Sequence, residues 1–419
     1  MKAIPHAALA AVLLLGTGAA HAQPIDPRVQ ARIDRILKQT PLIDGHNDLP
    51  WELRESHGRR VAGLESGGAA LEKPLMTDIA RLQAGRVGGQ FWSVYITGTI
   101  LGDEAIRTTI EQIDTARRLI EAYPGDLELA SSADDVIRIH RSGRIASMLG
   151  IEGGRQMGGS MAALRQFHNL GVRYMTLTHN QTTEWADSAT DEPRHGGISP
   201  FGAQVIGEMN RLGMLLDLSH VSPESMKDAL QMSRAPVIFS HSNAFALNPH
   251  PRNVPDDVLR LLPANGGVVM VNFYPVFLSR EVREWSVRRT TEEARLKALA
   301  PFSAAAVEAG VKQWEAANPR PPVPVGVVAD HIEHIAGLAG HDYVGIGGDL
   351  DGVPYTAVGL ESVAGYPLLF AELIRRGWSD GNLAKLAGGN VLRVMRRAEA
   401  VAVSMKNSEP SLATLPPTP

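Results

Sequence analysis

The sequence contains no cysteine among its 419 residues, and its formal net charge is only −4. The missing thiols exclude disulfide bridges, a thiolate metal site, a cysteine nucleophile and an acylated N-terminal cysteine. Charges of both signs in similar numbers argue against a nucleic-acid partner. Any metal ion must therefore be bound by histidine, aspartate and glutamate side chains.

Other common signatures are missing as well. No Gly-x-Ser-x-Gly elbow accompanies Ser219-His220 or Ser240-His241, so these pairs do not indicate a serine hydrolase. No glycine-rich phosphate loop of the Walker type occurs. The tail over residues 404–419 is polar with several prolines, which predicts disorder. It carries no hydrophobic run, so we expect no C-terminal lipid anchor.

The N-terminus has the pattern of a secretory signal peptide. Lys2 precedes an apolar run over residues 7–20, and Ala20-His21-Ala22 supplies a small-x-small cleavage site. The run is too short to be a membrane span. We therefore expect residues 1–22 to be removed and the mature protein to be exported, either to the periplasm or to the medium.

Eight short apolar runs alternate with helical patterns through residues 23–403. Most are continuous rather than alternating, as in strands that are buried on both faces. They span residues 42–48, 91–96, 147–152, 174–179, 214–220, 237–241, 268–274 and 343–349. This alternation predicts a single (β/α)8 TIM-type barrel. A mostly helical insertion, residues 278–325, separates the seventh and eighth runs.

Metal-capable side chains stand at the ends of most of these runs. They are His46, Asp48, Glu152, His179, His220, His241, Asp349 and Asp351. Barrel enzymes place their active sites at the C-terminal ends of the strands. A single buried histidine can be satisfied by one hydrogen bond and then has no functional role. Four of fourteen histidines at equivalent positions, together with acidic residues, predict a functional site.

Five of these residues suit a centre with two zinc ions. His46, Asp48, Glu152, His220 and His241 exceed the three protein ligands of a typical catalytic zinc. Two ions that share a carboxylate would use all five, and Glu152 is the candidate bridge. Ions about 3.5–4 Å apart can hold a hydroxide between them and polarise a carbonyl or phosphoryl oxygen.

The roles of the other polar residues stay open on residue type alone. His179 could donate to the oxyanion of a tetrahedral intermediate, or could be a further ligand. Asp349 could pass a proton from the attacking water to the leaving nitrogen, and Asp351 competes for that role. Arg252, beyond the sixth run, could clamp a substrate carboxylate or be a solvated loop residue.

These residues, in this order, resemble the membrane (renal) dipeptidase family of zinc peptidases, within the amidohydrolase-type barrels. The matching segments extend over nearly the whole chain that follows the signal peptide. They are residues 43–50, 151–154, 177–180, 217–220, 240–242, 252–256, 271–274, 347–352 and 388–390. The resemblance implies that His46 and Asp48 bind one Zn2+ and His220 and His241 the other, with Glu152 as the bridge.

The resemblance also implies roles around the two ions. His179 would face the transition state, Arg252 would hold the substrate carboxylate and Asp349 would shuttle the proton. Tyr274, in the matching segment 271–274, is assigned to substrate binding. The implied reaction is dipeptide hydrolysis that tolerates a D-residue at the C-terminal side, and some family members open carbapenem β-lactams. Mammalian relatives are lipid-anchored and disulfide-linked. This chain has no cysteine, so a homodimer of it would be non-covalent.

Two other functions fit parts of the pattern. The metal centre alone does not name the bond cleaved, so a lactonase or phosphotriesterase of the amidohydrolase type is an alternative. An exported binding barrel without activity is a second alternative. It is disfavoured because every expected ligand position holds a competent residue.

Overall fold

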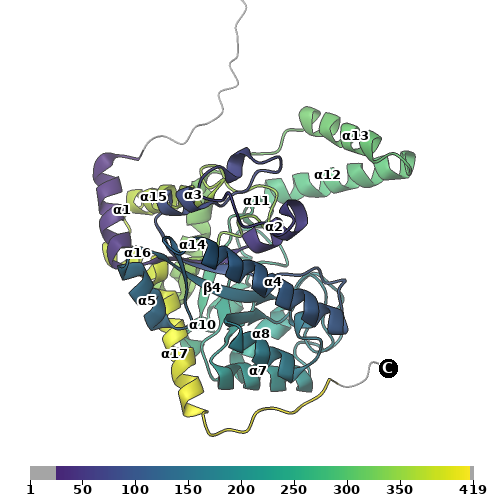
Figure 1. Ribbon diagram of the computed structural model, residues 1–419. Coiled ribbons are helices and arrows are strands. Elements are labelled where there is room, and N and C mark those ends of the chain that lie inside the picture. Colours follow the sequence, from purple (N-terminus) through teal and green to yellow (C-terminus); the bar gives the residue numbers. More distant parts are fainter. Residues whose placement is uncertain (1–24, 416–419) are drawn as a thin grey trace, which may run out of the picture.

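The computed structural model describes residues 25–415, and its elements are arranged as a barrel surrounded by helices (Figure 1). The signal-peptide prediction for residues 1–22 lies outside this range. The first helix, α1 (Pro27–Gln39), begins where the Asp26 side chain accepts hydrogen bonds from the backbone N–H groups of Arg28 and Val29. Among the described residues, no helix is long and apolar enough to cross a membrane.

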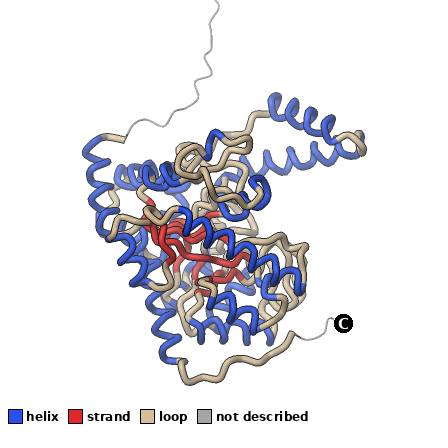
Figure 2. The backbone as a smooth tube through the Cα atoms, in the orientation of Figure 1, coloured by secondary structure: helices blue, strands red, loops and turns tan. Residues whose placement is uncertain are grey.

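Eight parallel strands close into a barrel at the centre of the molecule (Figure 2). They are β1 (Leu42–Asn47), β2 (Val87–Ser93), β4 (Ile145–Glu152), β5 (Val172–Thr176), β6 (Leu215–Asp217), β7 (Ile238–Phe239), β8 (Val268–Val271) and β9 (Val344–Ile346). Each pairs with its neighbour, β2 pairs with β4, and β9 returns to β1. Nearly all strand residues are buried, as continuous apolar runs predict for strands covered on both faces. The predicted (β/α)8 barrel is confirmed.

One strand was not predicted. The three-residue strand β3 (Leu127–Leu129) pairs with the first half of β4, on the side that β5 occupies further along. A strand this short has too few residues to show any periodicity, so the sequence pattern could not indicate it.

Helices cover the outside of the barrel (Figure 1). After α1 they are α2 (Leu49–His57), α3 (Ile79–Ala84), α4 (Gly102–Ala122), α5 (Ala133–Arg141), α6 (Met161–Asn169), α7 (Pro200–Leu212), α8 (Pro223–Met232), α9 (Asp256–Leu259), α10 (Leu262–Asn265), α11 (Pro275–Leu278), α12 (Arg280–Leu299), α13 (Ala304–Ala317), α14 (Val325–Ala339), α15 (Tyr366–Arg375), α16 (Asp380–Ala384) and α17 (Asn390–Ser404). Several begin with a serine whose hydroxyl accepts from the third helical N–H, as at Ser199 and Ser222.

The segment between β8 and β9 contains a helical hairpin. Helices α12 and α13 pack against each other and project away from the barrel (Figure 1). Trp285 and Trp314 hold the hairpin together, with ring centroids 5.9 Å apart, and Arg289 bonds Glu315 across it at 2.6 Å. The chain then returns along the barrel as α14.

The polar C-terminal tail differs from the predicted disorder as far as residue 415. Arg165 donates to the Ser411 carbonyl at 2.9 Å, and the Ser411 N–H donates to Glu208 at 3.1 Å. Ala413 and Leu415 pack against the core. Ala413, Leu415 and the buried carboxylate of Glu208 therefore hold the segment. A prediction from the average composition of the tail does not detect contacts made by so few residues.

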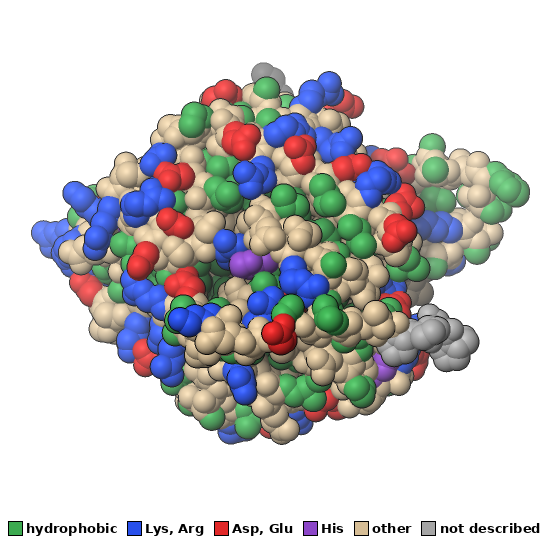
Figure 3. All heavy atoms as spheres, turned by 60° about the horizontal axis from the view of Figure 1, so that its bottom comes forward, with side chains coloured by type: hydrophobic (Ala, Val, Ile, Leu, Met, Phe, Trp, Pro, Cys, Tyr) green, Lys and Arg blue, Asp and Glu red, His purple; other side chains and the backbone are tan. Residues whose placement is uncertain are grey.

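The surface mixes charges of both signs. On the face shown in Figure 3, lysine and arginine side chains alternate with aspartate and glutamate, and histidine is visible near the middle of the view. This distribution matches the small net charge of the sequence.

Candidate active site

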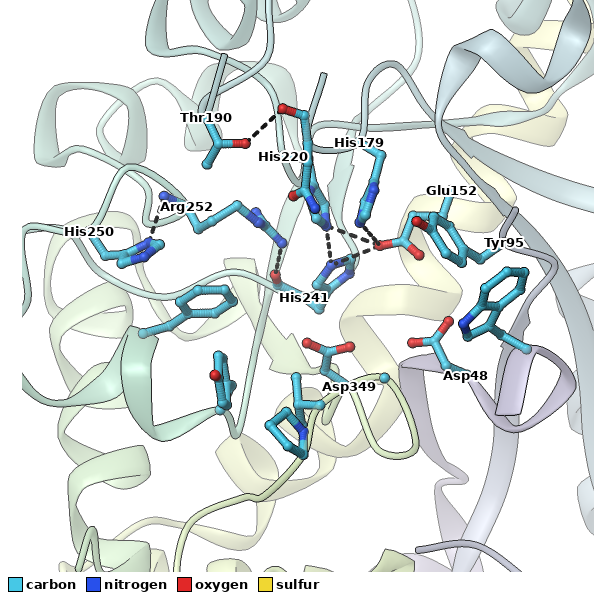
Figure 4. Close-up of a pocket in the computed structure, with 17 residues that line it drawn as sticks. Asp48, Tyr95, Glu152, His179, Thr190, His220, His241, His250, Arg252 and Asp349 are labelled. Carbon is cyan, nitrogen blue, oxygen red and sulfur yellow. Dashed lines mark hydrogen bonds and ion pairs between the residues drawn. The ribbon is translucent and has the colours of Figure 1, made fainter. Parts of the chain in front are cut away.

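A cavity of about 400 Å³ opens at the C-terminal ends of the strands. Its lining includes most of the residues indicated by the sequence: Asp48, Glu152, His179, His220, His241, Arg252, Tyr274 and Asp349. His46 lies fully buried directly beneath Asp48 and Glu152. Residues from the beginning, middle and end of the chain therefore meet at one place (Figure 4).

Glu152 lies between two pairs of potential ligands. Its Oε1 is 3.0 Å from His220 Nε2 and 3.4 Å from His241 Nε2, and these two nitrogens are 2.9 Å apart. Its Oε2 is 3.5 Å from His46 Nε2, which is 3.0 Å from Asp48 Oδ2. The two carboxylate oxygens of Glu152 thus face two three-residue clusters, within which the ligand atoms lie at most 4.8 Å apart. A third such cluster, formed by His46, His241 and Asp349, links the two.

The pKa shifts of His220 and His241 suit metal binding. At His46, burial is outweighed by Tyr174, Asp48 and Glu152, which raise its pKa well above the ordinary histidine value, so a cation bound there would displace a proton. Burial, reinforced by the Arg252 guanidinium, holds the pKa values of His220 and His241 well below the ordinary histidine value. Both rings are therefore neutral, which is the form that binds a cation. Burial raises the pKa of Glu152, but His46, His179 and His220 together outweigh burial, and the pKa falls well below the usual range. Glu152 is consequently ionised.

The donor set fits two divalent ions of the zinc type. Three imidazoles and two carboxylates are buried together, and zinc accepts both ligand types. Neither His46 Nε2 nor Asp48 Oδ1 has a hydrogen-bond partner within residues 25–415. Buried polar atoms are normally satisfied, so these two atoms indicate a ligand that the protein itself does not supply.

Residues inside the barrel orient two of the three buried candidate ligand histidines, His46 and His241. His46 Nδ1 lies 2.8 Å from the Tyr174 hydroxyl, and His241 Nδ1 lies 2.8 Å from Ser240 Oγ. Ser240 in turn donates to Asp217 Oδ2 at 2.6 Å. A ring that donates from Nδ1 presents the lone pair of Nε2 to the centre, which is how outer residues fix metal-binding histidines. The sequence pattern did not indicate roles for Tyr174 or Asp217.

His220 occupies a constrained backbone position. Its φ is 68°, in the left-handed region that residues with a Cβ rarely adopt. Its carbonyl accepts from the Ala189 N–H at 2.7 Å and from the hydroxyls of Thr178 at 3.1 Å and Ser188 at 3.3 Å. Three donors hold the strained residue, so the position of the His220 ring is fixed by the surrounding loops.

The structure separates the two aspartates that the sequence left equivalent. Asp349 lines the cavity, and its Oδ2 accepts from Asn272 Nδ2 at 2.8 Å. Burial raises the pKa of Asp349 to about 8. Asp351 instead accepts from the Met76 N–H at 2.6 Å and does not line the cavity. Between Asp48 and Asp349 only a glycine fits, because a Cβ at Gly352 would lie 2.1 Å from Asp48 Oδ2.

His179 lies beside the two clusters without joining either. Its Nε2 is 3.7 Å from Glu152 Oε1, and its ring packs between those of Tyr95 and His220, at centroid distances of 4.7 and 4.3 Å. Burial lowers its pKa, so the ring is neutral. Because none of the potential ligand clusters in residues 25–415 includes His179, a role toward the substrate is favoured over a role as a sixth ligand.

Arg252 is a buried cation at the other end of the cavity. Its side chain is 3 % exposed, and burial lowers its pKa to about 10, so it stays protonated at neutral pH. One nitrogen lies 3.5 Å from the His241 carbonyl, whereas Nε and Nη1 have no hydrogen-bond partner in the described part of the chain. Such a cation requires an anionic partner. Tyr274 and Phe277 complete this end, with ring centroids 5.0 Å apart.

Comparison with known proteins identifies similar chains. The sequence profile of a family described as membrane dipeptidase (peptidase family M19) matches residues 30–409. Dipeptidase verJ of Clonostachys rogersoniana is 40% identical over 385 residues, which cover 89% of this chain and 88% of the relative.

Solved structures share the fold. The probable dipeptidase PvdM from Pseudomonas aeruginosa has a TM-score of 0.74 at 23% identity, covering 90% of this chain and 100% of that one. A metallopeptidase from Rhodobacter sphaeroides, liganded with a phosphinate mimic of the dipeptide L-Ala-D-Ala, has a TM-score of 0.70 at 23% identity. The alignment with the Rhodobacter protein covers 86% of this chain and 99% of that chain.

Proposed function

Given that the chain belongs to the membrane dipeptidase family, peptidase family M19, we propose that this metallo-dipeptidase works with two zinc ions per chain. The observation that carries the proposal is the position of Glu152. Its two oxygens face two different ligand pairs, His46 with Asp48 and His220 with His241. Glu152, with one of these pairs on each side, would hold two ions together.

The proposed chemistry divides between the ions and the side chains. When bound, two zinc ions polarise a peptide carbonyl and lower the pKa of water at the site. His179 donates to the carbonyl oxygen as negative charge develops there. Because bound cations would lower the raised pKa of Asp349, its carboxylate would be ionised. Its Oδ1, which Asn272 leaves free, then takes the proton of the attacking water and delivers it to the leaving nitrogen.

The substrate is a dipeptide with a free C-terminal carboxylate. The unpartnered nitrogens of Arg252 supply the charge and the donors that a carboxylate needs. Tyr274 lines the same end of the cavity. We extend to this chain the ligand of the Rhodobacter relative, a mimic of L-Ala-D-Ala, and propose that it accepts a D-residue at the C-terminal side. Carbapenem opening is a related activity to be assayed.

Arg252 also argues against the alternative substrates. A neutral lactone or phosphotriester would leave the buried guanidinium without an anionic partner, which is unfavourable. The proposal further includes export after removal of residues 1–22, supported by Lys2, the apolar run 7–20 and Ala20-His21-Ala22. A homodimer of this chain would be non-covalent, because the sequence has no cysteine.

A substrate panel tests the proposal. The zinc-loaded chain from residue 23 onward would be assayed against matched L-Ala-L-Ala and L-Ala-D-Ala, the C-terminal amide of each, a lactone and a phosphotriester. We expect hydrolysis of both free dipeptides and at least about tenfold slower hydrolysis of the amides, which lack the charge that Arg252 requires. Turnover of the lactone or the triester without turnover of dipeptides would contradict the proposal.

A further inference from the structure

The cavity end that holds Arg252 contains a second polar side chain, His250, which the sequence pattern did not indicate. His250 lies in the loop between β7 and α9 and lines the cavity beside Arg252. Figure 4 shows the two residues on one side of the cavity, with Asp48 and Tyr95 opposite and Glu152 between them. His250 is too far along the cavity to belong to either ligand cluster.

The hydrogen bonding of His250 assigns its tautomer. The backbone N–H of Arg252 donates to His250 Nδ1 at 3.2 Å, so Nδ1 accepts and carries no proton. A neutral imidazole then carries its single proton on Nε2. Burial, together with the guanidinium groups of Arg252 and Arg283, lowers the pKa of His250 to about 3, so the ring is neutral at physiological pH.

The ring is also held in place. It packs against Phe277 with a centroid distance of 4.6 Å, and the Arg252 guanidinium lies 5.3 Å from the centroid of the same ring. Arg283, from α12, donates to the Pro249 carbonyl and so fixes the adjoining loop. One aromatic ring therefore supports both polar side chains, and ordering a substrate between them requires little rearrangement.

We propose that His250 is a substrate-binding residue whose Nε2–H donates to the C-terminal carboxylate of the dipeptide, beside Arg252. This inference rests on the proposed function. A carboxylate has two oxygens with about four acceptor positions. The two free nitrogens of Arg252 use only part of this capacity, which leaves an oxygen for a third donor. His250 would thus add to the selectivity for a free carboxylate.

Three variants distinguish this role from simple packing. His250→Gln keeps an amide N–H at about the position of Nε2, His250→Asn places its amide near Nδ1 instead, and His250→Ala has neither. We expect KM for L-Ala-D-Ala to rise roughly 10-fold in the Ala and Asn variants and to stay within about 3-fold of the unsubstituted chain in the Gln variant. The kcat should change less than about 3-fold in all three, because no reacting atom is touched.

Direct binding supplies the second measurement. A phosphinate mimic of L-Ala-D-Ala, titrated by calorimetry into the zinc-loaded protein, should lose affinity in the same order, with Ala and Asn weaker than Gln. Equal losses in Gln and Asn would overturn the proposal, because packing alone would then explain the effect. An unchanged KM in His250→Ala would overturn it as well. No dipeptide hydrolysis by the unsubstituted chain would instead overturn the proposed function itself.

Discussion

The two ends of the cavity are built in different ways. At the metal end, the ligand side chains follow the barrel strands, and residues inside the barrel such as Tyr174 and Asp217 orient them. At the other end, where the substrate carboxylate is proposed to bind, Arg252 and His250 come from one loop and pack against Phe277 from α11. This is called the carboxylate end. In the proposed function, the metal ligands stand at the barrel strand ends, with loops holding the His220 carbonyl, whereas the proposed substrate contacts come from beyond the strands.

This division predicts different kinetic consequences at the two ends. Changes at the metal end should lower kcat or zinc content. Changes at the carboxylate end should raise KM and leave the metal in place.

The largest effect is expected from Asp349→Asn. The amide cannot accept the proton, but it is isosteric and can keep a hydrogen bond to Asn272. We expect kcat to fall by roughly 10³-fold while metal analysis still finds two zinc ions per chain. Asp351→Asn is the matched control, because Asp351 bonds the Met76 backbone outside the cavity. A greater loss of kcat in the control would reverse the assignment.

A smaller effect, confined to KM, is expected from Arg252→Ala. The variant loses the charged donors at the carboxylate end, so KM for L-Ala-L-Ala should rise about 100-fold with zinc content unchanged. Arg252→Lys should be intermediate, since an ammonium keeps the charge but not the paired donors. Steady-state kinetics with metal analysis checks both. If KM stayed the same in the Ala variant, the carboxylate would have to bind elsewhere.

The smallest effect is expected from Ser240→Ala. The hydroxyl links His241 to Asp217, so its removal frees the His241 ring to turn. We expect about 10-fold weaker binding of the zinc held by His220 and His241, and no change for the other ion, in competition with a chelator. Ser242→Ala is the control, because its hydroxyl bonds Ser219 and not the ring. Equal weakening of both ions would contradict the division between the sites.

Much of the metal end could be predicted from the sequence, because a run of apolar residues ending in histidine or a carboxylate locates a strand tip. The barrel and the family were both obtained in this way. The strand ends were less accurate: β6 stops at Asp217, three residues before His220. His220 itself has a positive φ of 68°, outside strand geometry, and sequence alternation carries no trace of it.

The sequence could not decide whether Asp349 or Asp351 is the proton shuttle, again because backbone dihedral angles leave no trace in the sequence pattern. Residues two apart in a strand share a face, but both aspartates have positive φ, near 61° and 63°, and their side chains diverge. The sequence could not indicate His250 or Phe277 either, because a loop residue and a residue of a four-residue helix show no periodicity that would locate them in space. The sequence pattern located candidate ligands at strand ends, and the family resemblance added Arg252 and Tyr274, but neither indicated His250 or Phe277.

The position of Glu152 between two ligand pairs is the centre of this account, and zinc titration tests it most directly. The metal-free chain would be titrated with zinc while dipeptide hydrolysis is followed, in parallel with Glu152→Gln. We predict that activity reaches its maximum at two zinc ions per chain, and that Glu152→Gln binds fewer than two and hydrolyses dipeptides far more slowly. Full activity with one ion, or two ions retained by Glu152→Gln, would contradict it.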